Sequence, residues 1–295
     1  MNKTAKIETS FWIIGLVFSA LWASASVASK IALQSAQPFV ISLVRFCMAS
    51  LVMLVLAHGI LKRPLPTRSQ WKQLVIFGLL NVALYLGFFI LAIGQVSAGL
   101  GTIALALNPV LITVLYSLLN RKSPSFAGIF SLALGFCGVM ICAYPLLVGS
   151  HATITGIFLL FLSMLVYSLG TIYFQKSNWQ NLDMITINGW QTFFGAFFTL
   201  PAMLLFWKGE TNHFDAGFWS ATGWLAIVVS IVAVQSWIYL LRHYHRTAVY
   251  WLFLSPIFGF FYSNWLTGET IGILTIIGTI LVLTALAINV RNKQE

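Results

Sequence analysis

The sequence predicts an all-α integral membrane protein. Of its 295 residues, 59% are hydrophobic and only 7% are charged, whereas soluble globular proteins carry about 25% charged residues. Long apolar runs recur along the chain, and roughly 20 apolar residues form a helix that crosses the ~30 Å of hydrocarbon in a bilayer. The alternating pattern of a membrane barrel strand is absent from these runs. We therefore expect a bundle of membrane-spanning helices.

Ten membrane-spanning helices are expected, with no cleaved leader ahead of them. The first apolar run begins at Phe11 after a short basic tail, is long enough to span, and lacks the small-residue pattern of a signal-peptide cleavage site. The connections after the third and ninth runs are so short that the helices they join must be antiparallel neighbours. The expected spans cover residues 11–30, 39–61, 71–93, 97–119, 125–148, 154–175, 186–207, 217–240, 247–266 and 270–290.

The charges in the loops predict how the chain is oriented. With the N-terminus in the cytoplasm, thirteen of the sixteen Lys and Arg residues fall on the cytoplasmic side, and Lys208 alone falls in an outer loop. Because Lys and Arg concentrate in cytoplasmic loops, both termini are predicted to be cytoplasmic. This distribution explains the net charge of +10 without a nucleic-acid partner. We expect a multi-pass protein of a bacterial inner membrane, whose partners are the lipid bilayer and a small-molecule substrate.

One stretch of the sequence returns in altered form. Residues 97–122 read SAGLGTIALALNPVLITVLYSLLNRK, with a proline in the middle of an apolar run. A shift of 147 residues places Asn108 and Pro109 on Ser255 and Pro256. The sequence therefore predicts that one structural unit is used twice.

The two copies are expected to have opposite orientations in the membrane. Five spans per copy is an odd number, so the second copy must enter the membrane from the opposite side. The shift also places the cation Lys122 on the anion Glu269, which fits a change of side. We therefore predict two inverted five-helix repeats, residues 1–150 and 151–295, an arrangement typical of secondary transporters.

Several motifs together resemble a known family. They are Trp22-Ala-Ser-Ala-Ser at the end of the first span, Arg45 in the second, the SAG…NP stretch at 97–109, and its RTA…SP partner. In order and spacing they are similar to the EamA type of the drug/metabolite transporter superfamily, over nearly the whole chain. The resemblance implies a ten-helix carrier of small metabolites, with peripheral fifth and tenth helices and a central cavity among the other eight. Members often have an acidic residue after the fourth span, where this chain has Lys122.

Aromatic and polar side chains inside the spans are the candidate substrate-binding residues, because polar groups are costly in hydrocarbon. Trp22 and Tyr167 lie on serine- and threonine-rich helix faces, and such small residues also serve close helix packing. Their bulky rings do not assist close packing, so we expect both to line the cavity. Asn81 and Tyr85 stand four residues apart on one face of the third span. For Asn81, a cavity lining and a structural bond between helices are equally open.

Arg45 is the most informative single residue. A guanidinium facing the bilayer would cost about 2 to 3 kcal/mol on insertion scales, and the spans contain no Asp or Glu to pair with it. One interpretation is that it extends outward to the interface alongside Lys30. The other is that it faces the cavity and binds a carboxylate or other anion with two hydrogen bonds, which lysine does not reproduce.

The repeated prolines predict breaks in two spans. Pro109 and Pro256 each lack an amide hydrogen and crowd the carbonyl four residues earlier, which frees that carbonyl and bends the helix. Asn108, Ser255 or a substrate would then satisfy the freed carbonyl, and Asn108 is also a candidate substrate-binding residue. A hinge or gate is the functional interpretation, and a tolerated kink is the alternative.

Other polar residues lie toward the cytoplasmic side. Gln235 and Tyr239 share a face of the eighth span, and Gln191 lies on the inner part of the seventh, so these three are expected to line an inward vestibule. The HYHR run at 243–246 is interpreted as a cytoplasmic turn rather than a metal site. The three cysteines show no metal-ligand spacing, so neither a metal nor a cofactor is expected.

The expected function is a secondary carrier that moves small organic metabolites by alternating access, and not an enzyme. Amino acids or related compounds are the leading class, export is the expected direction, and a monomer or homodimer is the expected state. Acids are scarce in the spans, which favours facilitated diffusion or exchange over proton coupling. A multidrug or cation exporter is the alternative, although it would need an acid in the cavity. A lipid or isoprenoid enzyme would need clustered acids, histidines or a metal at one membrane face.

Overall fold

All regular secondary structure that the computed structural model describes is helical. The structure describes residues 3–105, 107–121, 126–148, 152–179, 182–248, 251–252, 254–268 and 272–291. Lys122 and Glu269, the pair with inverted charge, lie outside the described residues.

The helices of the two halves of the chain follow one another with short connections. In the first half they are α1 (Lys3–Ala32), α2 (Pro38–Leu54), η1 (Val55–Ile60), α3 (Arg68–Gly78), η2 (Leu79–Leu84), α4 (Tyr85–Ile93), α5 (Ala98–Leu105), α6 (Asn108–Leu119) and α7 (Phe126–Val148). In the second half they are α8 (Ile154–Lys176), α9 (Met184–Leu205), η3 (Gly209–Thr211), α10 (Ala216–Trp224), η4 (Leu225–Ala233), α11 (Val234–Ala248), α12 (Ser255–Tyr262), η6 (Ser263–Thr267) and α13 (Ile273–Arg291). Each expected span contains helix, and η1, η2, η4 and η6 are π-helical turns that continue an α-helix.

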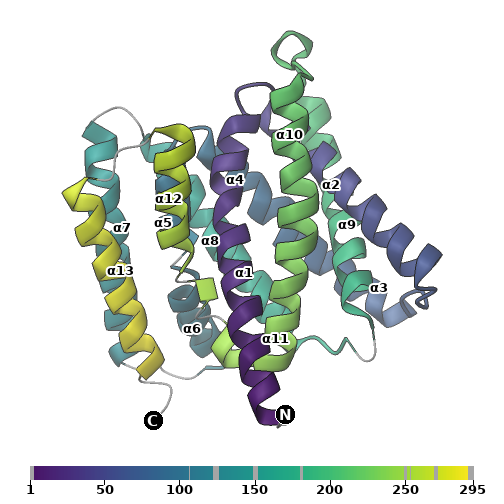
Figure 1. The fold of residues 1–295 in the computed structure, drawn as a ribbon, viewed down its shortest axis with the longest axis horizontal. Coiled ribbons are helices and arrows are strands. Elements are labelled where there is room, and N and C mark those ends of the chain that lie inside the picture. The colour runs from purple at the N-terminus through teal and green to yellow at the C-terminus, as the bar shows by residue number, and fades with distance from the viewer. Residues whose placement is uncertain are drawn as a thin grey trace.

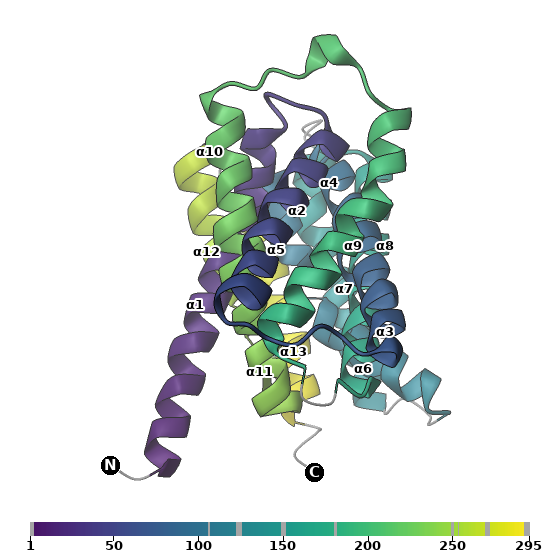
Figure 2. The ribbon, with the colours of Figure 1, turned by 90° about the vertical axis from the view of Figure 1, so that its right-hand side faces the viewer.

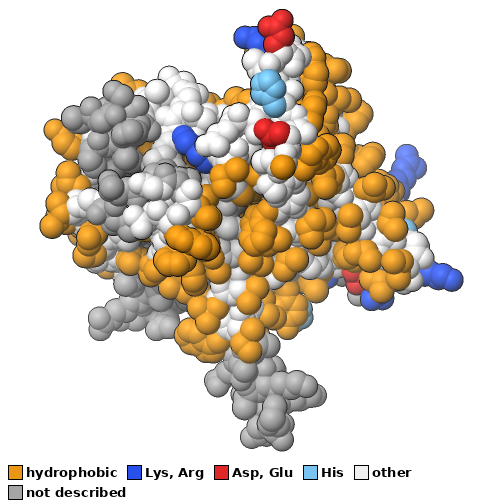
Figure 3. Space-filling model, turned by 45° about the horizontal axis from the view of Figure 1, so that its top comes forward, with side chains coloured by type: hydrophobic (Ala, Val, Ile, Leu, Met, Phe, Trp, Pro, Cys, Tyr) orange, Lys and Arg blue, Asp and Glu red, His pale blue; other side chains and the backbone are white. Residues whose placement is uncertain are grey.

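The surface of the bundle is apolar. Six helical runs of the described residues are long and apolar enough to cross a membrane, and they begin at Phe11, Pro38, Arg68, Ala98, Ile154 and Ala216. Large hydrophobic side chains such as Phe126 (84% exposed) and Ile154 (82% exposed) stand on the outside. In Figure 3 hydrophobic side chains cover much of the described surface, while charged ones are few and lie mainly on the projecting loop and at the margins. Such a surface suits lipid, and the prediction of an all-helical, multi-span membrane protein is confirmed.

The helices stand side by side, and both termini lie at the same end of the bundle (Figures 1 and 2). The helices α7 and α13 pack against each other at one edge, and they meet the rest of the bundle mainly through α5 and α6. They cover the expected fifth and tenth spans, and they lie at the periphery of the bundle as the resemblance implied. Around the centre, α2 packs on α9, α4 packs on α8, and α1 lies against η4, α10, α11 and α12.

Local sequence signals explain where several helices begin. The side chains of Thr153, Asp183 and Asp215 accept hydrogen bonds from backbone amides in the first turns of α8, α9 and α10. Thr67 and Gln70 form a capping box at the start of α3. Pro38 stands in the first turn of α2, where its missing amide hydrogen costs nothing.

Two boundaries differ from the expectation. The helix α11 runs to Ala248, so the HYHR run at 243–246 is part of a helix and the prediction of a turn there is wrong. The ninth span was expected from residue 247, but its helix α12 begins at Ser255. Residues 234–248 contain no Gly or Pro that would end α11 earlier. Pro256 favours a new helix start because proline fits the first turn.

Glycines allow two close helix crossings. A Cβ atom added to Gly259 of α12 would lie 2.2 Å from Thr102 Oγ1 of α5. A Cβ atom added to Gly195 of α9 would lie 2.1 Å from Val82 Cγ1 of η2. Small residues at these crossings let the backbones approach, as is common in membrane bundles.

Candidate functional site

A small cavity lies among the central helices. Its volume is about 20 Å³, which is room for roughly one water molecule. Its walls come from α1, α2, η2, α4, α9, η4 and α11, and the lining residues are Trp22, Arg45, Phe46, Asn81, Val82, Tyr85, Leu86, Asn188, Gln191, Thr192, Ser230 and Val234. Both halves of the chain therefore contribute to the cavity.

A chain of hydrogen bonds crosses one side of this cavity. Arg45 Nε donates to Ser230 Oγ at 2.8 Å, and Asn188 Nδ2 donates to the carbonyl oxygen of Ser230 at 3.0 Å. Gln191 Nε2 donates to Asn188 Oδ1 at 2.9 Å, and Asn81 Nδ2 donates to Gln191 Oε1 at 3.1 Å. All five residues are buried. The chain joins α2 and η2 of the first half to α9 and η4 of the second, so Asn81 both lines the cavity and bonds between helices.

Arg45 is buried, at 5% exposed, and lines the cavity. In the described part of the chain, no Asp or Glu forms an ion pair with it, and its two terminal nitrogens make no hydrogen bond. The guanidinium carbon also lies 5.7 Å from the ring centre of Phe46. Since a guanidinium has five N–H donors, four remain for another partner.

The outward interpretation of Arg45 is wrong in this structure, because the side chain points into the bundle. Lys30 has a different role at the end of α4, where its Nζ donates to the carbonyl oxygens of Ile93 at 3.1 Å and Val96 at 2.7 Å. Lys30 therefore stabilises a helix C-terminus rather than sharing an interfacial position with Arg45.

Aromatic rings form the other side of the cavity. The rings of Trp22 and Tyr85 are nearly parallel, at 15°, with centroids 6.5 Å apart. Tyr167 packs behind both, at 6.1 Å from Trp22 and 4.8 Å from Tyr85. Within the described residues the buried Trp22 Nε1 has no hydrogen-bond partner. The cavity thus joins a cationic, amide-rich side to an aromatic side.

Two π-helical turns carry residues of the hydrogen-bond chain. Asn81 lies in η2 and Ser230 in η4. A π turn inserts an extra residue into the helical repeat and turns the side chains there toward a new direction, which is why such turns occur frequently at functional sites. Ser163 of α8 donates to the carbonyl oxygen of Tyr85, directly after η2, at 2.9 Å.

The structure brings five of the nine expected binding residues to the central cavity, and these are Trp22, Arg45, Asn81, Tyr85 and Gln191. Tyr167 is in contact with them through its ring. Gln191 was expected in an inward vestibule, but its hydrogen bonds to Asn81 and Asn188 place it in the centre.

Gln235 and Tyr239 line a separate open groove of about 360 Å³, together with Ile14, Met184, Ile231, Val232 and Ser236. Asn108 does not line the central cavity. Its Nδ2 lies 3.3 Å from Met164 Sδ, and its Oδ1 accepts from Ser168 Oγ at 3.4 Å, so it joins α6 to α8.

Both prolines stand where a helix starts again. Pro109 lies in the first turn of α6, after α5 has ended at Leu105, and Pro256 lies in the first turn of α12. The hydroxyl of Ser255 is buried without a hydrogen-bond partner among the described residues, so it does not satisfy a freed carbonyl there.

Sequence reasoning missed Asn188, Thr192 and Ser230. Asn188 and Thr192 stand three residues before and one after Gln191, so all three share a helix face, and that spacing is a usable signal. Ser230 is a lone hydroxyl in an apolar run, and nothing in the sequence marks it. In the part of the chain that is described, no group of three or more His, Cys, Asp or Glu side chains could hold a metal ion.

Comparison with known proteins bears on this arrangement. The model of the EamA-like transporter family matches residues 10–144 and again residues 154–291. An uncharacterized transporter of Synechocystis sp. is 26% identical, with 93% of this chain and 87% of that protein covered. The uncharacterized transporter YvbV of Bacillus subtilis is 25% identical, with 100% of this chain and 96% of that protein covered.

Similar proteins also occur outside bacteria. A chloroplastic WAT1-related protein of Arabidopsis thaliana is 26% identical over 90% of this chain and 66% of its own length. A solved crystal structure of another protein superposes with a TM-score of 0.69 at 15% identity, over 96% of this chain and 98% of that one. At that identity the superposition shows the fold alone.

Proposed function

The chain belongs to the EamA-like transporter family, and we propose that it exports small organic metabolites by alternating access. Amino acids and related compounds are the leading substrate class, and a bacterial inner membrane is the proposed location. The proposed topology has ten transmembrane helices in two inverted five-helix repeats, residues 1–150 and 151–295, with both termini cytoplasmic. The functional unit is a monomer or a homodimer.

The burial of Arg45 and its unused hydrogen-bond donors are the main support for the proposed substrate class. Arg45 is a buried cation that lines a cavity between the two family-matched segments, with four N–H donors that no described residue occupies. A carboxylate matches the paired geometry of these donors. The neighbouring amides of Asn81 and Gln191 and the rings of Trp22 and Tyr85 supply polar and apolar contacts for the rest of a small solute.

The position of the cavity supports alternating access. In transporters built from inverted repeats, the substrate site lies at the interface of the repeats near the bilayer midplane. Here the hydrogen bonds Arg45–Ser230 and Asn81–Gln191 both cross between the two segments. At about 20 Å³ the cavity is smaller than any amino acid. We infer that the segments move apart on one side to admit the substrate.

We propose that transport proceeds by facilitated diffusion or exchange and is not coupled to protons. No acidic side chain lines the described cavity, and none is available there to carry a proton. Pro109 and Pro256 are the proposed hinges, because each stands in the first turn of a helix that follows a break in the chain of helices.

Solute efflux from proteoliposomes tests the proposal. Vesicles with the purified protein are loaded with individual amino acids, and efflux is compared with protein-free vesicles, with and without a pH gradient. We expect protein-dependent efflux of at least one amino acid without the gradient. Efflux only under a pH gradient would contradict the coupling, movement of organic cations alone would favour a multidrug exporter, and no flux of any solute would overturn the carrier.

A further inference from the structure

Polar contacts join the two family-matched segments at both ends of the bundle. At the end that holds the chain termini, the loop after η1 meets the start of α9. At the opposite end, the connection between α1 and α2 meets the loop between α9 and α10 (Figures 1 and 2). The central cavity lies between these two sets of contacts.

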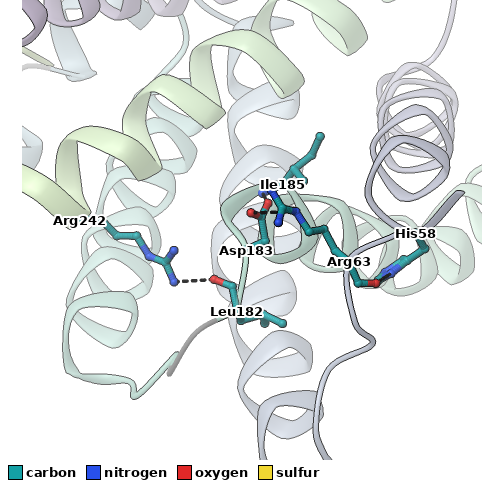
Figure 4. A network of polar contacts seen from close by, with 6 residues as sticks. All are labelled: His58, Arg63, Leu182, Asp183, Ile185 and Arg242. Atoms are coloured by element: carbon teal, nitrogen blue, oxygen red, sulfur yellow. Dashed lines mark hydrogen bonds and ion pairs between the residues drawn. The ribbon is translucent and has the colours of Figure 1, made fainter. Parts of the chain in front are cut away.

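The contacts at the end with the termini form what we call the terminal latch, made by His58, Arg63, Asp183 and Trp190. Arg63 Nε lies 3.4 Å from Asp183 Oδ2, and Trp190 Nε1 donates to His58 Nε2 at 3.0 Å. His58 Nδ1 lies 2.9 Å from the Arg63 carbonyl oxygen. Figure 4 shows Arg63 and His58 on one side of Asp183, with Arg242 on the other side.

The terminal latch also contacts the first turn of α9. Asp183 Oδ1 accepts from Ile185 N at 3.1 Å while its Oδ2 meets Arg63. Arg242 of α11 donates to the carbonyl oxygen of Leu182 at 2.8 Å. A movement of α9 away from η1 would therefore break the terminal latch and keep the bond to α11, which lies within the second segment.

The contacts at the opposite end form what we call the far latch, made by Ser35, Gln37, Asn212 and Asp215. Ser35 Oγ donates to Asp215 Oδ2 at 3.1 Å, and His213 N donates to the Ser35 carbonyl oxygen at 2.7 Å. The backbone amide of Gln37 donates to Asn212 Oδ1 at 2.9 Å, and Asn212 Nδ2 donates to Gln37 Oε1 at 3.0 Å.

Gln37 connects further to the same loop. Its Nε2 donates to the carbonyl oxygen of Phe206 at 2.8 Å, and its Oε1 also accepts from Lys208 N at 2.7 Å. Hydrogen bonds from Phe218 N and then from Ser35 lower the pKa of the Asp215 carboxyl, so it accepts as a carboxylate at neutral pH. The far latch is therefore a second polar closure between the segments.

We propose that the terminal latch and the far latch are the two gates of the carrier, and that they open in turn. The inference rests on the proposed alternating access and assigns its gate residues. With both latches closed, the cavity between them is too small for a metabolite. Most of the latch side chains are exposed or half-buried, with Arg63 at 49% and Asp183 at 33% exposed, whereas Ser35 is buried. Exposed ion pairs and neutral hydrogen bonds contribute little each, so water can replace them when a gate opens.

Cavity accessibility tests the gates without any substrate. The native cysteines Cys47, Cys137 and Cys142 are replaced by serine, and Thr192→Cys places one thiol on the cavity wall. Labelling by a membrane-impermeant maleimide is measured separately from each face of oriented vesicles. A protease-sensitive tag at the C-terminus identifies the face that carries the termini, so the assay does not depend on the proposed topology.

One variant weakens each latch. Asp183→Asn with Trp190→Phe removes the ion pair and the indole hydrogen bond while keeping a side chain that caps α9. Gln37→Ala removes the hydrogen bonds that the Gln37 side chain makes to Asn212, Lys208 and Phe206, and it leaves the Ser35–Asp215 bond in place. We expect the first variant to raise labelling from the terminal face about fivefold and to lower it from the far face. We expect Gln37→Ala to do the reverse.

Matched controls remove hydrogen bonds that stay within one segment. Ser177→Ala loses a bond to the carbonyl oxygen of Tyr173, and Thr211→Ala loses a bond to that of Lys208. In both control variants we expect the cavity cysteine to be labelled from each face as in the parent protein. Unchanged labelling in the latch variants, or labelling that rises from both faces in either of them, would overturn the gates. If the two latch variants shift labelling to opposite faces but the protein transports no amino acid, the gate assignment would hold and only the proposed function would be contradicted.

Discussion

At the scale of single residues, Arg45 combines burial with unused hydrogen-bonding capacity. A buried charge is retained in a membrane bundle when it is paired or when it binds a ligand. Its one described hydrogen bond is to Ser230, and no described acid pairs with it. The guanidinium is therefore held in place at Nε while its fork of terminal donors faces the cavity.

Replacing Arg45 tests whether its guanidinium binds a substrate carboxylate through two parallel hydrogen bonds. We expect Arg45→Lys to reduce amino-acid efflux at least about tenfold, because lysine keeps the charge but cannot make two parallel hydrogen bonds to one carboxylate. Arg45→Ala should lose transport as well. Efflux from proteoliposomes at matched protein content provides the measurement. Near-normal transport by both variants would remove Arg45 from the site.

Asn188 is predicted to be the structural centre of the hydrogen-bond chain. It bonds to Ser230, Gln191 and Thr192, so Asn188→Ala leaves several buried groups without partners. We expect a loss of about 1–3 kcal/mol in unfolding free energy, seen as a lower unfolding temperature in detergent. Thr279→Ala on the peripheral α13 loses one bond to the backbone of its own helix and serves as the control. Equal unfolding temperatures for the two variants would contradict this role.

Sequence reasoning found the residues that stand out chemically. A lone arginine and large rings in apolar spans have few explanations, so Arg45, Trp22 and Tyr85 were predictable. Asn108 also looked like a binding residue, but the same polarity serves its bonds to Met164 and Ser168. No sequence pattern distinguishes a packing bond from a cavity lining, because the facing helix is unknown.

At the scale of elements, helix breaks and close crossings organise the bundle. The expected spans follow from apolar length, and most observed helices agree with them within a few residues. The exceptions are α11, which continues through polar residues to Ala248 because no breaker interrupts it, and α12, which begins at Ser255 instead of near residue 247. The π turns η2 and η4 were not predicted, because they depend on how neighbouring helices pack rather than on any local residue.

Pro109 is predicted to act as a hinge at the break between α5 and α6. Pro109→Ala restores the amide hydrogen and allows a more continuous helix. We expect a several-fold lower efflux rate without a lower unfolding temperature. Unchanged efflux in this variant and in Pro256→Ala would identify both prolines as tolerated kinks.

The crossing of α5 and α12 depends on Gly259. Because a Cβ atom there would lie 2.2 Å from Thr102 Oγ1, Gly259→Ala must push the two helices apart. We expect a loss of about 1–3 kcal/mol in stability, measured as a lower unfolding temperature. Gly223→Ala in α10 is the matched control, since nothing lies within 4 Å of the added atom. If Gly259→Ala unfolded at the same temperature as Gly223→Ala, the close crossing of α5 and α12 would be contradicted.

At the scale of the whole molecule, the two family-matched segments meet in the middle and at both ends. The centre holds the cavity and its hydrogen-bond chain, and each end holds one latch. The internal repeat was visible in the sequence through Asn108-Pro109 and Ser255-Pro256. The partners within the latches were not visible, because they join residues more than 100 positions apart in the chain.

A comparison of the transport of an amino acid with that of its carboxamide tests whether the cavity recognises a carboxylate. The two differ at the group that Arg45 is proposed to bind, and the amide has no negative charge. In proteoliposomes of the parent protein, we predict that the best transported amino acid leaves at least about tenfold faster than its amide, and that Arg45→Ala abolishes this difference. Equal protein-dependent flux of acid and amide through the parent would contradict carboxylate recognition in the cavity.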